Sequence, residues 1–92
     1  MKPHLHKILR FAKDDIVAVH ADTRVFVFYT DEANYDAYLN DYDFEYYGSA
    51  VSSFPFYMAP PSPGVWHLVI EQEDMGKDLN VRIEVISEHS LT

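Results

Sequence analysis

The sequence contains no cysteine among its 92 residues. It therefore offers neither a disulfide nor a thiol nucleophile, and a zinc site would depend on histidine and carboxylate ligands alone. Its three glycines are scattered, so no glycine-rich phosphate loop is available. No apolar run approaches the length of a membrane span, and the chain opens without a signal-peptide pattern. We therefore expect a cytoplasmic protein that does not bind a membrane.

Basic residues are missing from the middle of the chain. No lysine or arginine occurs between Arg24 and Lys77, and the net charge of the whole sequence is −8. Binding to nucleic acid through phosphate neutralisation needs a basic footprint, so we predict no direct nucleic-acid binding. An acidic surface attracts basic partners and also keeps a small protein soluble, and both explanations of the charge stay open.

What the sequence does contain is strand-like alternation. Hydrophobic residues make up 48% of the chain, which is long enough for one domain over residues 1–92. In most of the chain these residues alternate with a period of two, and β-branched and aromatic types are frequent. The fold class that we predict is mainly β: a small antiparallel β-sandwich or partly open barrel of about 6–8 short strands with one inserted helix.

Several details of this fold depend on a few residues. Pro55 lacks a backbone N–H, so its strand is expected to lie at an edge or to be broken there. Residues 64–72 are apolar on both faces and are expected at the centre of a sheet. A short connection at residues 21–23 favours a hairpin between the strands that flank it. A further strand is expected from Asp43, and Gly48 is expected to end it or to form a bulge.

Residues 30–41, TDEANYDAYLND, depart from the period of two. Thr30 or Asp31 suits the N-cap of a helix, and the acids Asp31 and Glu32 suit the positive end of its dipole. Four side chains fall at positions i, i+3, i+4 and i+7, which places them on one helical stripe: Tyr35, Tyr38, Leu39 and Tyr42. We predict one short helix near 31–40 with these four side chains turned inward.

The order of these features resembles a bacterial family catalogued as domain of unknown function 1883. That family's pattern is a strand pair, Asn-Tyr with a second Tyr three residues later, an aromatic-x-Tyr-Tyr-Gly-Gly segment, a proline, and Pro-x-x-Gly-x-Trp before a long apolar strand. The matching residues here are Asn34, Tyr35, Tyr38, Phe44, Tyr46, Tyr47, Gly48, Pro55, Pro61, Gly64, Trp66 and Ile70.

The resemblance covers about residues 14–87 and has two departures. Ser49 stands where the pattern has a second glycine, and Glu71 stands where it has an aspartate. The resemblance implies a compact β-sandwich. Because some relatives are joined to TIR domains, it also implies a sensing or adaptor role. It implies no catalytic residues.

The candidate binding residues are acids and tyrosines in one stretch of the chain. Exposed tyrosine often anchors an interface, and carboxylates attract a basic surface. We predict a protein partner with a basic surface, bound by a chain that is a monomer or a weak homodimer. The predicted partner-binding residues are Asp31, Glu32, Asp36, Asp41, Asp43, Glu45, Tyr46 and Tyr47.

Histidines raise two further alternatives. His4 and His6 lie two residues apart, a spacing that metal ligands use, with His20, His67 or a carboxylate as a third ligand. No sequence spacing ties these ligands together, so we predict neither a metal site nor a cofactor. His67 beside Trp66 would suit a general base, but no nucleophile motif accompanies it, since Ser49 lacks the G-x-S-x-G context.

The function that we predict is a non-enzymatic binding or adaptor module that presents an acidic, tyrosine-rich surface to a protein or small ligand. A first alternative is a phage-type acidic inhibitor that blocks the basic nucleic-acid-binding groove of a bacterial defence complex. Its motive is the long segment without lysine or arginine. A second alternative is a small hydrolase-like enzyme that uses His67.

Overall fold

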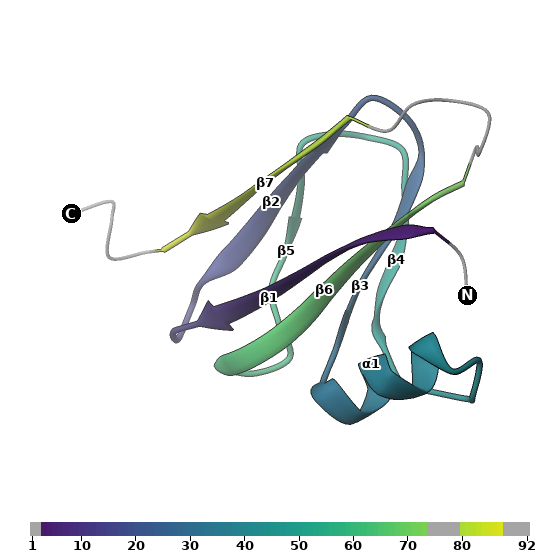
Figure 1. Cartoon of the computed structure of the whole chain (residues 1–92). Coiled ribbons are helices and arrows are strands. Elements are labelled where there is room, and N and C mark those ends of the chain that lie inside the picture. Colours follow the sequence, from purple (N-terminus) through teal and green to yellow (C-terminus); the bar gives the residue numbers. More distant parts are fainter. Residues whose placement is uncertain (1–2, 74–79, 88–92) are drawn as a thin grey trace.

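The computed structural model describes residues 3–73 and 80–87. In this part of the chain, seven strands form two antiparallel sheets that face each other, and there is one helix (Figure 1). The elements are β1 (His4–Phe11), β2 (Ile16–Ala21), β3 (Val25–Thr30), α1 (Glu32–Leu39), β4 (Tyr47–Val51), β5 (Phe56–Met58), β6 (Gly64–Gln72) and β7 (Val81–Ile86).

The strand order confirms a β-sandwich, and the described strands do not close into a barrel. One sheet has four strands in the order β1-β6-β3-β4, and the other has three in the order β5-β2-β7. As the sequence predicts, the apolar β6 is central, paired with β1 and β3, while β5 lies at an edge directly after Pro55. The proline thus stands where its missing N–H costs no ladder hydrogen bond.

Alternation along the strands places one apolar set between the sheets. The buried core between them is formed by Phe11, Val17, Val19, Val25, Val27, Tyr29, Val51, Leu68 and Ile70. A polar contact also links the two sheets: the hydroxyl of Tyr29 on β3 donates a 2.8 Å hydrogen bond to the carbonyl oxygen of Met58 on β5. Leu5 and Leu9 of β1 pack against the same core.

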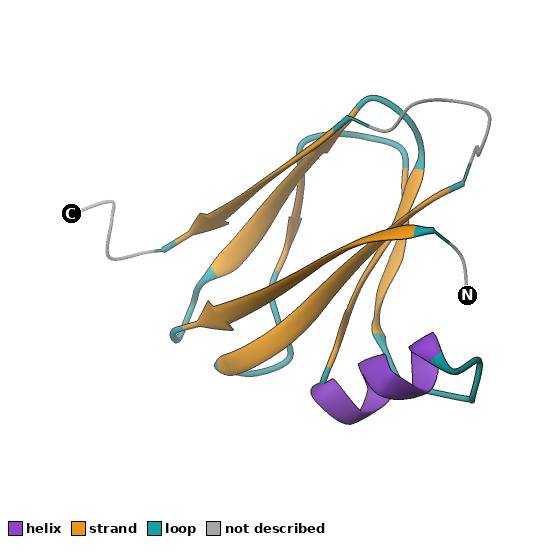
Figure 2. Ribbon diagram, in the orientation of Figure 1, coloured by secondary structure: helices purple, strands orange, loops and turns teal. Residues whose placement is uncertain are grey.

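The outer face of the four-stranded sheet carries a second, smaller core under α1. Phe28, Tyr38 and Val69 are buried there, with Phe26, Tyr35, Leu39 and Phe44 packed around them. The helix lies at the end of this sheet where β3 ends and β4 begins, and the three-stranded sheet is on the opposite side of the molecule (Figure 2). The sequence prediction of one short helix near 31–40 is confirmed.

The predicted hairpin between β2 and β3 is wrong. The two strands belong to different sheets, so residues 21–23 carry the chain from one layer to the other. Each strand finds its partners far away in sequence, β2 with β5 and β7, and β3 with β4 and β6. A short loop therefore joins the layers here, because both strands bury their apolar face against the opposite sheet.

Gly48 neither ends nor bulges its strand. It lies inside β4, in register with Phe28 of β3. A Cβ atom at this position would lie 2.1 Å from the carbonyl oxygen of Val27 and 2.5 Å from the Cβ of Phe28. The glycine is therefore required by close approach of the β3 backbone. The strand itself begins at Tyr47, so the predicted strand start at Asp43 is also wrong.

Candidate functional site

The candidate site is the acidic segment, defined as residues 31–46, which comprises α1 and the loop that follows it. Asp31 is the N-cap of the helix, and its Oδ1 accepts a 2.8 Å hydrogen bond from the backbone N–H of Asn34. Glu32 adds a carboxylate in the first turn, where the helix dipole favours negative charge. The segment contains no lysine or arginine.

The loop folds back along the helix through defined hydrogen bonds. The backbone N–H of Tyr42 donates to the carbonyl oxygen of Ala37 at 2.9 Å. At the other end of the loop, the backbone N–H of Glu45 donates to the side-chain oxygen of Asn34 at 2.8 Å. The amide nitrogen of Asn34 donates in turn to Asp31 at 3.0 Å. The last residues of the loop are therefore fixed beside the first turn of α1.

This geometry brings most of the predicted partner-binding residues together. All six predicted acids have exposed side chains on α1 or its loop: Asp31, Glu32, Asp36, Asp41, Asp43 and Glu45. Tyr46 continues the same surface, with its ring 47% exposed and its centroid 5.4 Å from that of Phe28. Tyr47 lies apart from them, because it begins β4 and its ring contacts Trp66 on the other side of the sheet.

Tyr42 corrects the predicted inward stripe. The helix ends at Leu39, and Asp41 adopts a left-handed backbone conformation with φ of 58°, which reverses the chain. Tyr42 is therefore not at position i+7 of a continuing helix, and it is 71% exposed. Sequence reasoning missed it as a surface residue, although an Asn-Asp pair, which tolerates such a reversal, precedes it. Tyr35, Tyr38 and Leu39 do face the sheet as predicted.

Tyr38 anchors the middle of α1 to the central strand. Its hydroxyl donates a short hydrogen bond of 2.5 Å to a carboxylate oxygen of Glu71 on β6. Burial, followed by the hydrogen bond to Glu71, raises the pKa of the Tyr38 hydroxyl well above its usual value. The Glu71 carboxylate is thus hydrogen-bonded to the helix and is not part of the exposed acidic surface.

Next to Tyr38 is the histidine–tyrosine stack, defined as His6, Tyr35 and His67. The ring centroids of His6 and Tyr35 are 3.9 Å apart, with the planes 12° from parallel. The centroids of His6 and His67 are 5.0 Å apart, and Nε2 of His6 lies 2.8 Å from Nδ1 of His67. Burial, and then the neighbouring His67 and His4, lower the pKa of His6. The stack joins α1 to both β1 and β6.

The strand pairing explains this cluster. Alternation puts His4 and His6 on the outer face of β1 and His67 on the outer face of β6, and antiparallel pairing places these faces side by side. His4 also reaches the helix, since its Nε2 lies 3.0 Å from the hydroxyl of Tyr35. The sequence identified each of these histidines, but the pairing of His6 with His67 depends on strand order.

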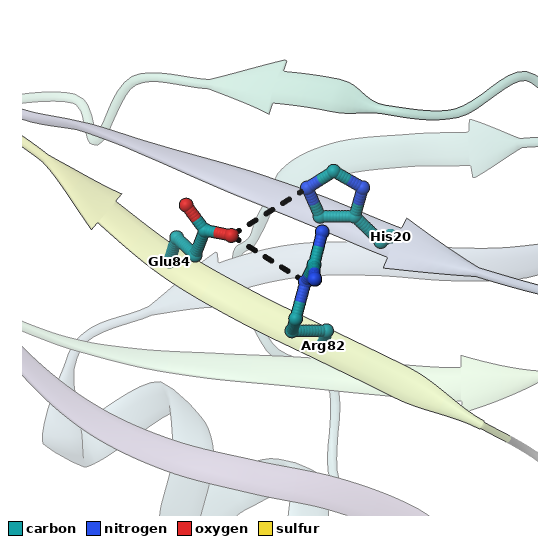
Figure 3. A network of polar contacts seen from close by, with 3 residues as sticks. All are labelled: His20, Arg82 and Glu84. Atoms are coloured by element: carbon teal, nitrogen blue, oxygen red, sulfur yellow. Dashed lines mark ion pairs between the residues drawn. The ribbon is translucent and has the colours of Figure 1, made fainter.

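His20, the other described histidine, lies far from the stack. It is on β2 of the three-stranded sheet, where Nε2 of His20 and Nε of Arg82 both approach Oε1 of Glu84, at 4.0 and 3.4 Å (Figure 3). It is therefore not a partner for His4 and His6. Within residues 3–73 and 80–87, no group of three histidine, aspartate or glutamate side chains is arranged to hold a metal ion.

An open pocket of about 470 Å³ lies between α1 and β6. Its lining consists of Glu32, Ala33, Tyr35, Asp36 and His67. His67 itself is only 8% exposed. Ser49, which the sequence analysis rejected as a nucleophile, lies on β4, and β3 separates it from β6. The two residues therefore do not form a nucleophile–base pair.

No helix in the described ranges has the length and apolar character that a membrane span needs. No curated protein and no solved structure matches the chain. One family model does match, over residues 3–89, and it is described as domain of unknown function (DUF1883). The residues that carry the resemblance include Asn34, Tyr35, Tyr38 and Gly48, which hold α1, its loop and β4 on the sheet. The chain belongs to the DUF1883 family.

Proposed function

We propose that this protein is a non-enzymatic binding module of the cytoplasm whose acidic segment binds a protein partner with a basic surface. The observation that carries the proposal is the hydrogen bond between Asn34 and Glu45. It fixes the loop beside α1, so that six exposed carboxylates belong to one compact unit with no basic residue in it.

The chemistry of this unit suits protein recognition. The exposed rings of Tyr42 and Tyr46 provide apolar contact area with few rotatable bonds, and their hydroxyls remain available at the rim. The carboxylates provide attraction to lysine and arginine at longer range, which raises the rate of association. Because hydrogen bonds and ring packing already order the segment, binding requires little further ordering of the chain.

The test uses two variants of equal charge. The loop variant carries Asp41→Asn, Asp43→Asn and Glu45→Gln, and all three substitutions remove the negative charge while keeping the size and shape of the side chain. The control variant carries Asp14→Asn, Glu73→Gln and Glu84→Gln, which are exposed acids outside the acidic segment. Each immobilised protein is used to capture partners from a lysate of cells that naturally express this chain, and the captured proteins are identified by mass spectrometry.

The expected result is a partner that the natural chain and the control variant retain and the loop variant loses. Equal retention by the two variants, or no protein retained specifically, contradicts the proposal. The identity of the partner also separates the two forms of the function. A nucleic-acid-binding defence complex captured through its basic groove supports the inhibitor form, whereas a signalling protein supports the adaptor form.

A further inference from the structure

The bond between His6 and His67 links the acidic segment to the protonation state of two side chains. Nε2 of His6 and Nδ1 of His67 are 2.8 Å apart, so one of these two nitrogens carries a hydrogen and the other accepts it. The bond is made between β1 and β6, and the ring of Tyr35 from α1 stacks on both imidazoles. The first half of α1 thus contacts the sheet through Tyr35 and the two imidazoles.

We propose that the His6–His67 pair is a pH-sensitive anchor for α1: a second proton on the pair removes the hydrogen bond between the imidazoles and loosens the first half of the helix from the sheet. The inference deepens the proposed function by naming a regulation of the same surface. Its consequence for binding rests on that function, but its effect on α1 does not.

The His6–His67 pair has three protonation states to consider. The neutral pair has one hydrogen between the two facing nitrogens. A first added proton goes to an outward-facing nitrogen, and the bond survives as a charge-assisted one. A second added proton places a hydrogen on both facing nitrogens, so neither accepts, and two cations then lie at the distance of the former bond. Only this doubly protonated state breaks the pair.

Other side chains around the pair carry charges of both signs. On β1, His4 adds positive charge on acidification, but its contact with the Tyr35 hydroxyl survives, because that oxygen also accepts hydrogen bonds. On β6, Glu71 faces His4 in register, and from α1, Glu32 and Asp36 line the pocket beside His67. These carboxylates carry charge opposite to that of a protonated imidazole.

The second proton is opposed by the first charge and by burial. Burial comes first among the causes that lower the pKa of His6, and the charges of His67 and His4 follow. Among the described residues, those in register with the pair are uncharged: Ile8 of β1 and Thr30 of β3 lie opposite His67, and Val69 of β6 lies opposite His6. The second protonation is therefore expected below the ordinary histidine pKa of about 6.5.

Loss of the pair is expected to act on one half of the helix. Tyr35 would lose its stacking surface, whereas Tyr38 keeps its hydrogen bond to Glu71 and its contact with Phe28. The N-cap Asp31 and the first five residues of α1 carry three of the six exposed carboxylates, those of Asp31, Glu32 and Asp36, so release of this part would disperse half of the proposed binding surface.

The test follows the full chain by NMR from about pH 7.5 to about pH 4.5, the range in which histidines titrate. Imidazole nitrogen shifts report the protonation of His6 and His67, and amide exchange reports helix protection. We expect two coupled protonation steps. At the second step, the protection factors of Tyr35 and Asp36 should fall about tenfold relative to those of β3. Independent titration of the two rings, or a constant ratio of protection factors, overturns the inference.

Two variants distinguish protonation of the His6–His67 pair from general effects of acid on the protein. His6→Phe keeps a flat ring on Tyr35 but takes no proton, so helix protection should become independent of pH. His20→Gln removes a histidine from the other sheet and should leave the transition unchanged. A transition that persists in His6→Phe contradicts the inference. The imidazole titration of the unsubstituted chain decides the question even when His6→Phe does not fold.

No partner is needed for these measurements, so their outcome is distinguishable from that of the proposed function. A helix transition that appears without any change in partner affinity contradicts the binding surface and supports the anchor. A partner that binds through the acidic segment, together with a helix whose protection does not change with pH, contradicts the anchor and supports the surface.

Discussion

The side-chain oxygen of Asn34 accepts a 2.8 Å hydrogen bond from the backbone N–H of Glu45, eleven residues further along the chain. Through this bond the loop after α1 returns to the start of the helix, and the acidic segment becomes one unit. Asn34→Ala removes this bond and the one that the Asn34 amide donates to Asp31, so we expect it to lower the free energy of unfolding by about 1–2 kcal/mol.

The local effect of Asn34→Ala should be larger than the global one, with faster hydrogen exchange at the amide of Glu45. Urea unfolding measures the first quantity and NMR the second. Asn40→Ala is the matched control, because Asn40 donates to the carbonyl oxygen of Asp36 at the other end of the helix. An unchanged exchange rate at Glu45 in Asn34→Ala would show that the loop is held by other contacts.

Gly48→Ala tests the close approach of β3 and β4. The added methyl group would overlap the carbonyl oxygen of Val27 and the Cβ of Phe28, which are both parts of a packed strand. We expect a loss of about 1–3 kcal/mol in the free energy of unfolding, as for overpacked cores. Ser49→Ala, at the exposed next position, should change it by less than about 0.5 kcal/mol. Equal effects of the two substitutions would refute this role of Gly48.

Tyr29→Phe tests the polar contact between the sheets. The substitution keeps the ring in the core but leaves the carbonyl oxygen of Met58 without its donor. An unpaired buried acceptor costs about 1–3 kcal/mol, so we expect thermal unfolding at a clearly lower temperature. Tyr57→Phe, which alters an exposed ring on β5 beside Met58, is the control and should be neutral. A Tyr29→Phe protein as stable as the natural one would show that water satisfies this carbonyl.

The raised pKa of the Tyr38 hydroxyl predicts how the free energy of unfolding changes at alkaline pH. Its pKa is raised in the folded state, so its contribution is complete below the ordinary tyrosine pKa of about 10 and is lost as the pH rises above that value. We expect the free energy of unfolding to fall above about pH 10, by up to about 1.4 kcal/mol per pH unit for this group. In Tyr38→Phe the fall should be smaller. Parallel pH profiles for the two proteins would contradict this assignment.

The alternation of residues predicts the strands because it is a local property of the chain. A strand that buries one face needs apolar side chains at every second position, and the sequence of β7 shows this alternation. Pairing is not local. The loop at residues 21–23 is short enough for a hairpin, yet β2 and β3 separate into different sheets, because each pairs with strands from the second half of the chain.

The candidate site shows the same division. The acids of the acidic segment are exposed, as charged side chains on a short helix and its loop must be, and the sequence predicts them. The exposure of Tyr42 depends on the left-handed backbone of Asp41, and the separation of Tyr46 from Tyr47 depends on where β4 begins. The pair formed by His6 and His67 depends on the register of β1 with β6.

Binding of a basic protein surface by the acidic segment should depend on salt. The decisive measurement is the dissociation constant of the captured partner, determined by calorimetry between low salt and about 0.5 M salt, since screening shortens the reach of exposed charges to below about 8 Å in that range. We predict steep weakening with salt for the natural chain and the control variant, and a shallower dependence for Asp41→Asn/Asp43→Asn/Glu45→Gln. A dissociation constant that is flat across the range, or equally steep in all three proteins, would contradict it.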